Sequence, residues 1–120
     1  PNLKVLNIPK KSITTAGLNA LYFNDSIWKG LTGLSLNGSN LSRFDVISIG
    51  SKFENLKTLK LMNYPSDINE NAFQEIAKKL TQLEEIELVQ DRSSPIPPNV
   101  IVAFAEKCPN LRKIKIEREK

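Results

Sequence analysis

The 120-residue chain has no histidine, a single cysteine (Cys108) and only five glycines. Histidine is the commonest metal ligand and the usual proton carrier near neutral pH, so its absence rules out a zinc enzyme and a Ser-His-Asp enzyme. The five glycines form no Gly-rich phosphate-binding motif. A lone cysteine cannot form an internal disulfide, which favours an intracellular setting, in the cytoplasm or the nucleus.

Long runs of apolar or of like-charged residues are also missing. The longest apolar run is far below the ~20 residues that a membrane span needs, and the first residues lack the character of a signal peptide, so we expect no membrane partner. Lysine and arginine number 17 against 13 aspartates and glutamates, but they form no like-charged run that would indicate a nucleic-acid-binding arm. With 40% apolar residues, the chain can form one domain with a small core.

A six-residue segment recurs five times along the chain. The copies are LKVLNI, LTGLSL, LKTLKL, LEEIEL and LRKIKI; they begin at residues 3, 31, 56, 83 and 111, so successive starts are 28, 25, 27 and 28 residues apart. In every copy the first, fourth and sixth positions are Leu or Ile. Alternation of this kind is typical of a strand with one buried face. The sequence therefore predicts five similar strands.

Apolar residues at helical spacing separate the five copies and predict helices over residues 16–23, 44–52, 70–79 and 98–107. Thr14, Ser42 and Asn69 precede the first three helices, and their side chains can accept hydrogen bonds from the free N–H groups of a first turn. The fourth helix instead begins at Pro97 and Pro98, where the missing N–H costs nothing.

Each unit is thus a strand, a loop and a helix that returns to a parallel strand one place along. Such a unit cannot cover its own apolar face, so neighbouring units must stack. We predict a single α/β domain over residues 1–120, a right-handed solenoid with five parallel strands on its concave face and about four helices on its convex face. Because no capping unit is visible, we expect a segment of a longer array, whose open strand edges contact further repeats or a capping domain.

This pattern resembles that of leucine-rich-repeat proteins. KSITTAGLNAL (residues 11–21) and EKCPNLRKIKI (residues 106–116) are similar to the two halves of the cysteine-containing repeat, with Cys108 and Leu111 at matching places. That subtype is related to ribonuclease-inhibitor-like horseshoes and is typical of F-box substrate receptors of ubiquitin ligases. Where the repeat usually carries Asn or Cys, this chain has Lys11, Ser39, Tyr64, Asp91 and Glu119, so we expect the buried ladder of those side chains to be absent or replaced.

The resemblance implies a non-enzymatic protein–protein interaction module, such as the substrate-recognition repeat domain of an F-box-type ubiquitin-ligase receptor. Two alternatives remain open. One is a structural scaffold or assembly subunit that works through its open strand edges. The other is a microbial effector repeat domain with no ubiquitin link.

Three carboxylates, Glu84, Glu85 and Glu87, stand close together in LEEIEL and could indicate a metal site or an acid/base pair. In adjacent strands, however, we expect three cross-strand rows: Lys60, Glu87 and Lys115; Thr58, Glu85 and Lys113; and Lys57, Glu84 and Arg112. Neighbouring cations satisfy carboxylates and lower carboxyl pKa values, whereas a catalytic acid needs a raised pKa. We therefore expect no catalytic residue, no metal and no cofactor.

The remaining interpretation of these rows is recognition of another protein. The concave face is the surface that we expect to bind it. The residues predicted to do so are Thr58, Lys60, Met62, Glu85, Glu87, Val89, Lys113 and Lys115.

Overall fold

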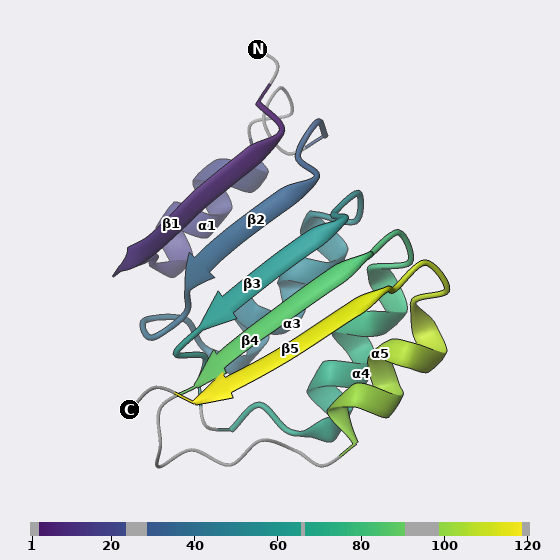
Figure 1. The fold of residues 1–120 in the computed structure, drawn as a ribbon. Coiled ribbons are helices and arrows are strands. Elements are labelled where there is room, and N and C mark those ends of the chain that lie inside the picture. The colour runs from purple at the N-terminus through teal and green to yellow at the C-terminus, as the bar shows by residue number, and fades with distance from the viewer. Residues whose placement is uncertain (1–2, 24–28, 66, 91–98, 119–120) are drawn as a thin grey trace.

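Five parallel strands form a single sheet whose spatial order follows the chain (Figure 1). The computed structural model describes residues 3–23, 29–65, 67–90 and 99–118. The strands are β1 (Val5–Ser12), β2 (Gly33–Asn37), β3 (Thr58–Met62), β4 (Glu85–Gln90) and β5 (Lys113–Arg118). Each begins at the third residue of one predicted copy, so the strand prediction is confirmed.

Four helices connect the strands within the described residues. They are α1 (Thr15–Tyr22), α3 (Arg43–Lys52), α4 (Glu70–Lys79) and α5 (Val100–Lys107). Figure 1 shows all four on one side of the sheet, so no described helix lies on the opposite side, which we call the open face. The arrangement is an α/β fold of solenoid-like form, as the repeats predict. The first three helices agree with the prediction to within one residue at each end, while residues 97–98, the predicted start of the fourth, lie outside the described residues.

Polar side chains begin three of the helices as the sequence predicts. Thr14, Ser42 and Asn69 accept hydrogen bonds from the backbone N–H groups of Gly17, Asp45 and Ala72, at 3.1, 3.2 and 3.0 Å. At α3 the bond is reciprocal, because the Asp45 carboxylate accepts from the Ser42 N–H at 3.0 Å. Each of these bonds satisfies a backbone donor that has no partner inside the helix.

Asp45 also connects α1 to α3. Its carboxylate accepts a hydrogen bond from the Thr15 hydroxyl at 2.5 Å, and Thr15 is the first residue of α1. Partial burial raises the pKa of Asp45, but the hydrogen bonds from Thr15 and Ser42, together with the charge of Lys52, outweigh it and hold the pKa below its ordinary value. The starts of α1 and α3 are therefore held together by a charged acceptor.

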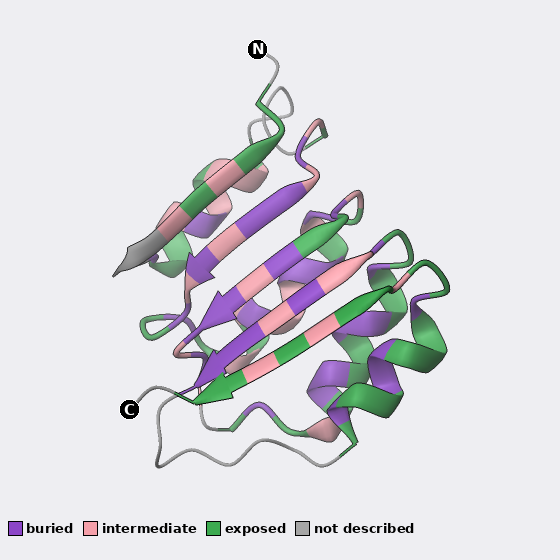
Figure 2. Ribbon diagram, viewed as in Figure 1, coloured by how far each residue is buried: buried purple, intermediate pink, exposed green. Residues whose placement is uncertain are grey.

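The core lies between the sheet and the helices. In-register residues of neighbouring strands supply it from one side, as Leu34, Leu59 and Ile86 do, and the helices supply Phe73 and Phe104 from the other. All five of these residues are buried. Figure 2 shows that burial is concentrated in β2, β3 and β4, whereas the outer strands β1 and β5 are exposed or half-buried where their burial is described. Among the described residues, β1 and β5 each pair with only one strand, so their apolar residues are less covered than those of the three inner strands.

Tyr64 replaces the Asn or Cys that the resembled repeat carries at its position. It is buried, its ring meets that of Phe73 edge-on at a centroid distance of 5.6 Å, and its carbonyl accepts from the buried Gln90 amide at 3.0 Å. Burial raises the pKa of the Tyr64 hydroxyl, although the charge of Arg118 partly offsets it. At this position, therefore, the expected polar ladder is replaced by an aromatic ring.

Gly50 allows α3 and α4 to approach closely. A Cβ atom placed on Gly50 would lie 3.2 Å from the Ile76 carbonyl oxygen and 3.2 Å from the Lys79 Cβ. Both distances are shorter than ordinary van der Waals contact, and one of the atoms belongs to the α4 backbone, which cannot rotate away. A side chain at residue 50 would therefore push the two helices apart.

We expect Gly50→Leu to lower the free energy of unfolding by about 1–3 kcal/mol, because it forces extra volume into packed structure. The neighbouring Ser51 is exposed on the same helix, so Ser51→Leu adds the same side chain outside the contact and should change stability by no more than about 0.5 kcal/mol. Urea unfolding of both variants tests the contact. Equal stability of the two would show that α3 and α4 do not meet at residue 50.

Candidate functional site: a groove across the open face

Two rows of side chains run across the strands on the open face. In the first row, in-register pairing aligns Val5, Gly33, Thr58, Glu85 and Lys113; in the second it aligns Asn7, Ser35, Lys60, Glu87 and Lys115. The predicted rows of Thr58, Glu85 and Lys113 and of Lys60, Glu87 and Lys115 are thus confirmed. The third predicted row is held by backbone bonds, from the Glu84 N–H to the Lys57 carbonyl at 2.7 Å and from the Arg112 N–H to the Glu84 carbonyl at 2.8 Å.

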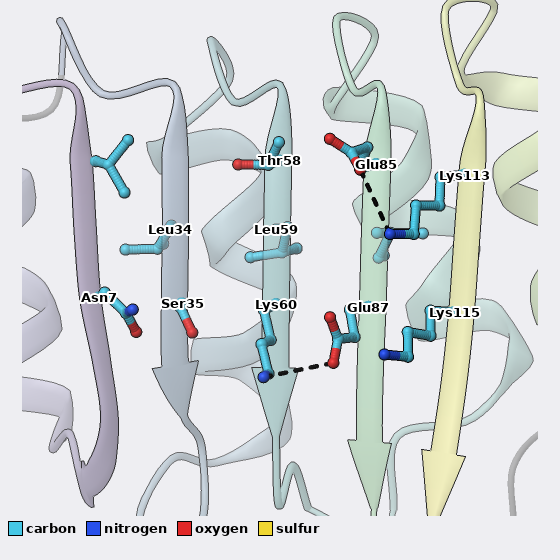
Figure 3. A pocket seen from close by; sticks show the side chains of 12 residues that line it. Asn7, Leu34, Ser35, Thr58, Leu59, Lys60, Glu85, Glu87, Lys113 and Lys115 are labelled. Carbon is cyan, nitrogen blue, oxygen red and sulfur yellow. Dashed lines mark ion pairs between the residues drawn. The ribbon is translucent and has the colours of Figure 1, made fainter.

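A shallow groove of about 180 Å³ lies between the first and second rows (Figure 3). Residues of all five strands line it. Between the two walls the strands pass through Leu34, Leu59 and Ile86, whose side chains are buried in the core. We call it the transverse groove, because it crosses the strands. The structure therefore brings six of the eight predicted binding residues to one hollow: Thr58, Lys60, Glu85, Glu87, Lys113 and Lys115.

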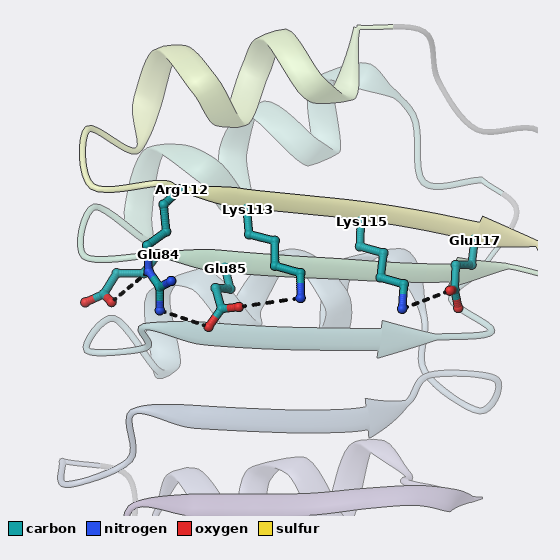
Figure 4. A network of polar contacts seen from close by, with 6 residues as sticks. All are labelled: Glu84, Glu85, Arg112, Lys113, Lys115 and Glu117. Atoms are coloured by element: carbon teal, nitrogen blue, oxygen red, sulfur yellow. Dashed lines mark hydrogen bonds and ion pairs between the residues drawn. The ribbon is translucent and has the colours of Figure 1, made fainter.

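Ion pairs connect the charged side chains of β3, β4 and β5. Lys60 Nζ lies 3.4 Å from Glu87 Oε2, and Lys113 Nζ lies 3.9 Å from Glu85 Oε1. Arg112 contacts Glu85 as well as Glu84, with its Nη2 at 3.4 Å from Glu85 Oε2 and its Nε at 3.7 Å from Glu84 Oε1 (Figure 4). Each of the three glutamates in LEEIEL thus has a cation within 4 Å.

Lys115 pairs along its own strand. Its Nζ lies 3.0 Å from Glu117 Oε1, two residues further along β5 (Figure 4). The hydrogen bond to Glu117 raises the pKa of Lys115, and the charges of Glu117 and Glu87 raise it further. Its ammonium group therefore stays protonated through the neutral and mildly alkaline range, and any stabilisation that it gives is present below its unfolded pKa and is lost as the pH rises through the folded value.

This arrangement can hold charge in fixed places but offers little for acid–base chemistry. Glu84, Glu85 and Glu87 are half-buried, and their oxygens already face cations. Among the described residues, no three His, Cys, Asp or Glu side chains come together as a metal site. What the open face can do chemically is present a pattern of ammonium, guanidinium and carboxylate groups to another molecule.

Two of the predicted binding residues, Met62 and Val89, do not face solvent as expected. They are 9% and 7% exposed and lie opposite one another in register. At this end of the strands, backbone bonds join neighbouring strands side by side: the Gly38 N–H donates to the Met62 carbonyl at 2.7 Å, and the N–H of Asn63, which has a left-handed φ of 53°, donates to the Val89 carbonyl at 2.9 Å. Because their side chains are buried, Met62 and Val89 offer little surface to a partner.

The predicted binding set leaves out the half of the groove formed by β1 and β2. Val5, Asn7 and Ser35 line it there, and the period of two along each strand would have found them. Gly33 shapes the wall, because a Cβ at that position would lie 2.9 Å from Thr58 Oγ1 and 3.1 Å from Val5 Cγ2. A glycine inside a strand often marks such a close approach.

Comparison with protein-family models, with curated proteins and with solved structures finds no match. In the part of the chain that the structure describes, no helix has the length and apolar character to span a membrane. The function must therefore be argued from the open face itself.

We expect the Lys60–Glu87 pair to contribute about 0.2–1 kcal/mol to stability, because both groups remain partly exposed and solvent screens them. A double-mutant cycle of Lys60→Met and Glu87→Gln, followed by urea unfolding, measures this coupling. In about 1 M NaCl the coupling should fall towards zero, because the Debye length there is only ~3 Å. A coupling energy that salt leaves unchanged would contradict a screened surface pair.

Proposed function

We propose that the chain is a non-enzymatic protein-binding module of the leucine-rich-repeat type, which receives another protein on the open face of its sheet. The observation that carries the proposal is the transverse groove, whose walls hold lysines and glutamates from three adjacent strands. Fixed charges of alternating sign steer a complementary partner and set its register. None of the four described helices covers these charges (Figure 1).

The repeat positions support the leucine-rich-repeat type. The first-position residues Leu31, Leu56 and Leu83 are buried, as that repeat requires. Cys108, at the place of the repeat's cysteine, is also buried, and its thiol donates to the Leu80 carbonyl at 3.3 Å. This bond joins the third and fourth units of the stack.

Within that class, the sequence resemblance favours the substrate-recognition repeat domain of an F-box-type ubiquitin-ligase receptor, acting in the cytoplasm or nucleus. The protein bound on the open face would then be the one marked with ubiquitin. A microbial effector repeat domain with no ubiquitin link would use the open face in the same manner. Measuring ubiquitin on the bound protein, with and without the chain in the cell, separates the two: an unchanged level disfavours the ligase setting.

We expect the triple substitution Lys60→Glu, Glu87→Lys and Lys115→Glu to weaken partner binding at least about tenfold, because it inverts the charges presented by the second row. Opposite charges still alternate across β3, β4 and β5 in this variant, so the sheet should remain folded. Proteins captured by the wild-type chain from extracts of the cells that make it are purified, and their affinities for both chains are measured by calorimetry.

Lys78→Glu is the matched control. It lowers the net charge of +4 by two units, as the triple substitution does, but it lies on α4, away from the open face. Binding that the triple substitution leaves unchanged, or that Lys78→Glu weakens equally, would count against the open face as the binding surface.

A second candidate function is a structural scaffold or assembly subunit. The observation that favours it is at the β5 edge, where Leu111, Ile114 and Ile116 are only half-buried and a hollow of about 380 Å³ opens beside Leu111 and Ile114. A further repeat, a capping domain or another subunit could add to this edge, as unpaired strands allow. Sedimentation of the purified chain over a range of concentrations tests the assembly role, because a monomer at all concentrations would disfavour it.

A further inference from the structure

We infer that the transverse groove binds an extended segment of the partner protein that runs across the strands and places acidic side chains at the β5 end. The inference rests on the proposed protein-binding function, and it names the chemistry of the partner. Three features of the groove support the inference: its dimensions, the distribution of charge along it, and the ion pairs of Lys113 and Lys115 at its β5 end.

The dimensions suit one extended chain. The walls are formed by residues two apart on each strand, which corresponds to a spacing of about 6.6–6.8 Å along the strand direction. Five strands separated by ~4.8 Å give a length of about 19 Å, which some six extended residues would span. The groove is too narrow for a helix, whose diameter with side chains is about 10–12 Å.

Charge is distributed unevenly along the groove. Its lining contains three lysines and two glutamates, an excess of one positive charge, and all five lie on β3, β4 and β5. The β1–β2 end is lined by Val5, Asn7 and Ser35, which are uncharged. A ligand that matches this lining is neutral over β1 and β2 and negative over β5.

Lys113 and Lys115 lie on opposite walls at the β5 end, as Figure 3 shows. Lys113 is 60% exposed, and its only pair partner among the described residues is Glu85, at 3.9 Å. Glu85 lies closer to Arg112, at 3.4 Å, than to Lys113. A ligand carboxylate could therefore pair with Lys113 and leave Glu85 paired with Arg112. Lys115 is paired with Glu117 at 3.0 Å, but its ammonium group has three N–H donors and keeps others for a ligand. A carboxylate between the two ammonium groups would therefore accept charge-assisted hydrogen bonds from both.

The same charges disfavour a nucleic acid. A nucleic-acid strand carries a phosphate at every nucleotide, and proteins that bind it line the path with cations. Here Glu85 and Glu87 occupy both walls at β4, and the β1–β2 end has no cation among its lining residues. A peptide that concentrates its negative charge at one end fits this pattern, whereas a uniformly charged polymer does not.

The test uses the purified full chain and a displayed library of random eight-residue peptides. We expect selected peptides to be enriched about fivefold or more in Asp and Glu at one end, relative to the unselected library. A selected peptide, synthesised with a fluorescent label, should bind Lys113→Ser/Lys115→Ser at least about tenfold more weakly than the wild-type chain. Its affinity for Lys78→Ser/Lys107→Ser, which removes two exposed helix lysines, should be unchanged.

Ser35→Arg separates failure of this inference from failure of the proposed function, because it places a long side chain in the groove at β2, away from the two lysines at the β5 end. Peptides that Ser35→Arg blocks, but that show no acidic preference or no loss with Lys113→Ser/Lys115→Ser, would overturn the inference and leave the open face as a binding surface. Peptides that none of these variants affects, or a failure to select any peptide, would overturn the inference.

The proposed function is tested separately by the captured partner proteins. If they also bind the triple charge-inversion variant as tightly as the wild-type chain, the proposed function is contradicted as well. A single-stranded DNA oligonucleotide that displaces the peptide and binds more tightly would assign the groove to nucleic acid instead.

Discussion

Replacing Phe73 with alanine should lower the free energy of unfolding by about 3–5 kcal/mol, the usual cost of deleting a buried aromatic ring. The Phe73 ring is fully buried and meets two other rings edge-on, that of Tyr64 at 5.6 Å and that of Phe104 at 6.2 Å between centroids. Tyr64 and Phe73 belong to the third unit of the stack, and Phe104 belongs to the fourth. The cavity would therefore open where the third and fourth units meet, and neighbouring backbone could not easily close it.

A loss of this size is a large share of the 5–15 kcal/mol that typically separates folded from unfolded states. Urea unfolding measures it directly. Phe44→Ala is the control, because Phe44 is 70% exposed and its ring contacts the guanidinium of Arg43 at 5.0 Å. That substitution should cost no more than about 1 kcal/mol. Similar losses for both variants would contradict a core organised around Phe73.

The sequence predicts the strands and helix starts because each depends on local chemistry. Leu or Ile at every second residue places these side chains on one face of a strand, which can then be buried. All five copies form strands at the same relative position. A short polar side chain before a helix satisfies donors within three residues of itself, as Ser42 and Asn69 do. Neither prediction required knowledge of the packing between units.

The details of the binding surface depend on features that the repeat does not encode. Alternation predicts the face on which Met62 and Val89 lie, but it does not predict that both are buried there. Strand pairing aligns Lys115 with Glu87, yet its ammonium group bonds to Glu117 on the same strand. Side-chain rotamers and loop paths decide these outcomes, and single-sequence patterns contain little information on either.

Cys108 should react with thiol reagents far more slowly in the folded chain than in the unfolded one. Its thiol is buried and donates to the carbonyls of Leu80 and Ala77, at 3.3 and 3.6 Å. Burial raises the pKa of Cys108 from an ordinary 9.0 to about 11. Because only the thiolate attacks, a pKa of about 11 leaves roughly one molecule in a thousand reactive at pH 8, against about a tenth for a thiol with the ordinary pKa of 9.0. Ionisation alone thus predicts a rate about 100-fold lower in the folded chain.

Labelling with iodoacetamide at pH 8, in buffer and in about 8 M urea, measures this ratio by mass spectrometry. Cys108→Ala/Ser51→Cys moves the thiol to an exposed position on α3 and should label rapidly in both solutions. The raised pKa also makes the stabilisation from the neutral thiol full below pH 9 and progressively lost between pH 9 and about 11, because the unfolded thiol ionises first. The Cys108→Ala variant should not show this loss of stability between pH 9 and about 11. Fast labelling of the folded wild-type chain would contradict a buried, hydrogen-bonded thiol, whereas slow labelling would support it.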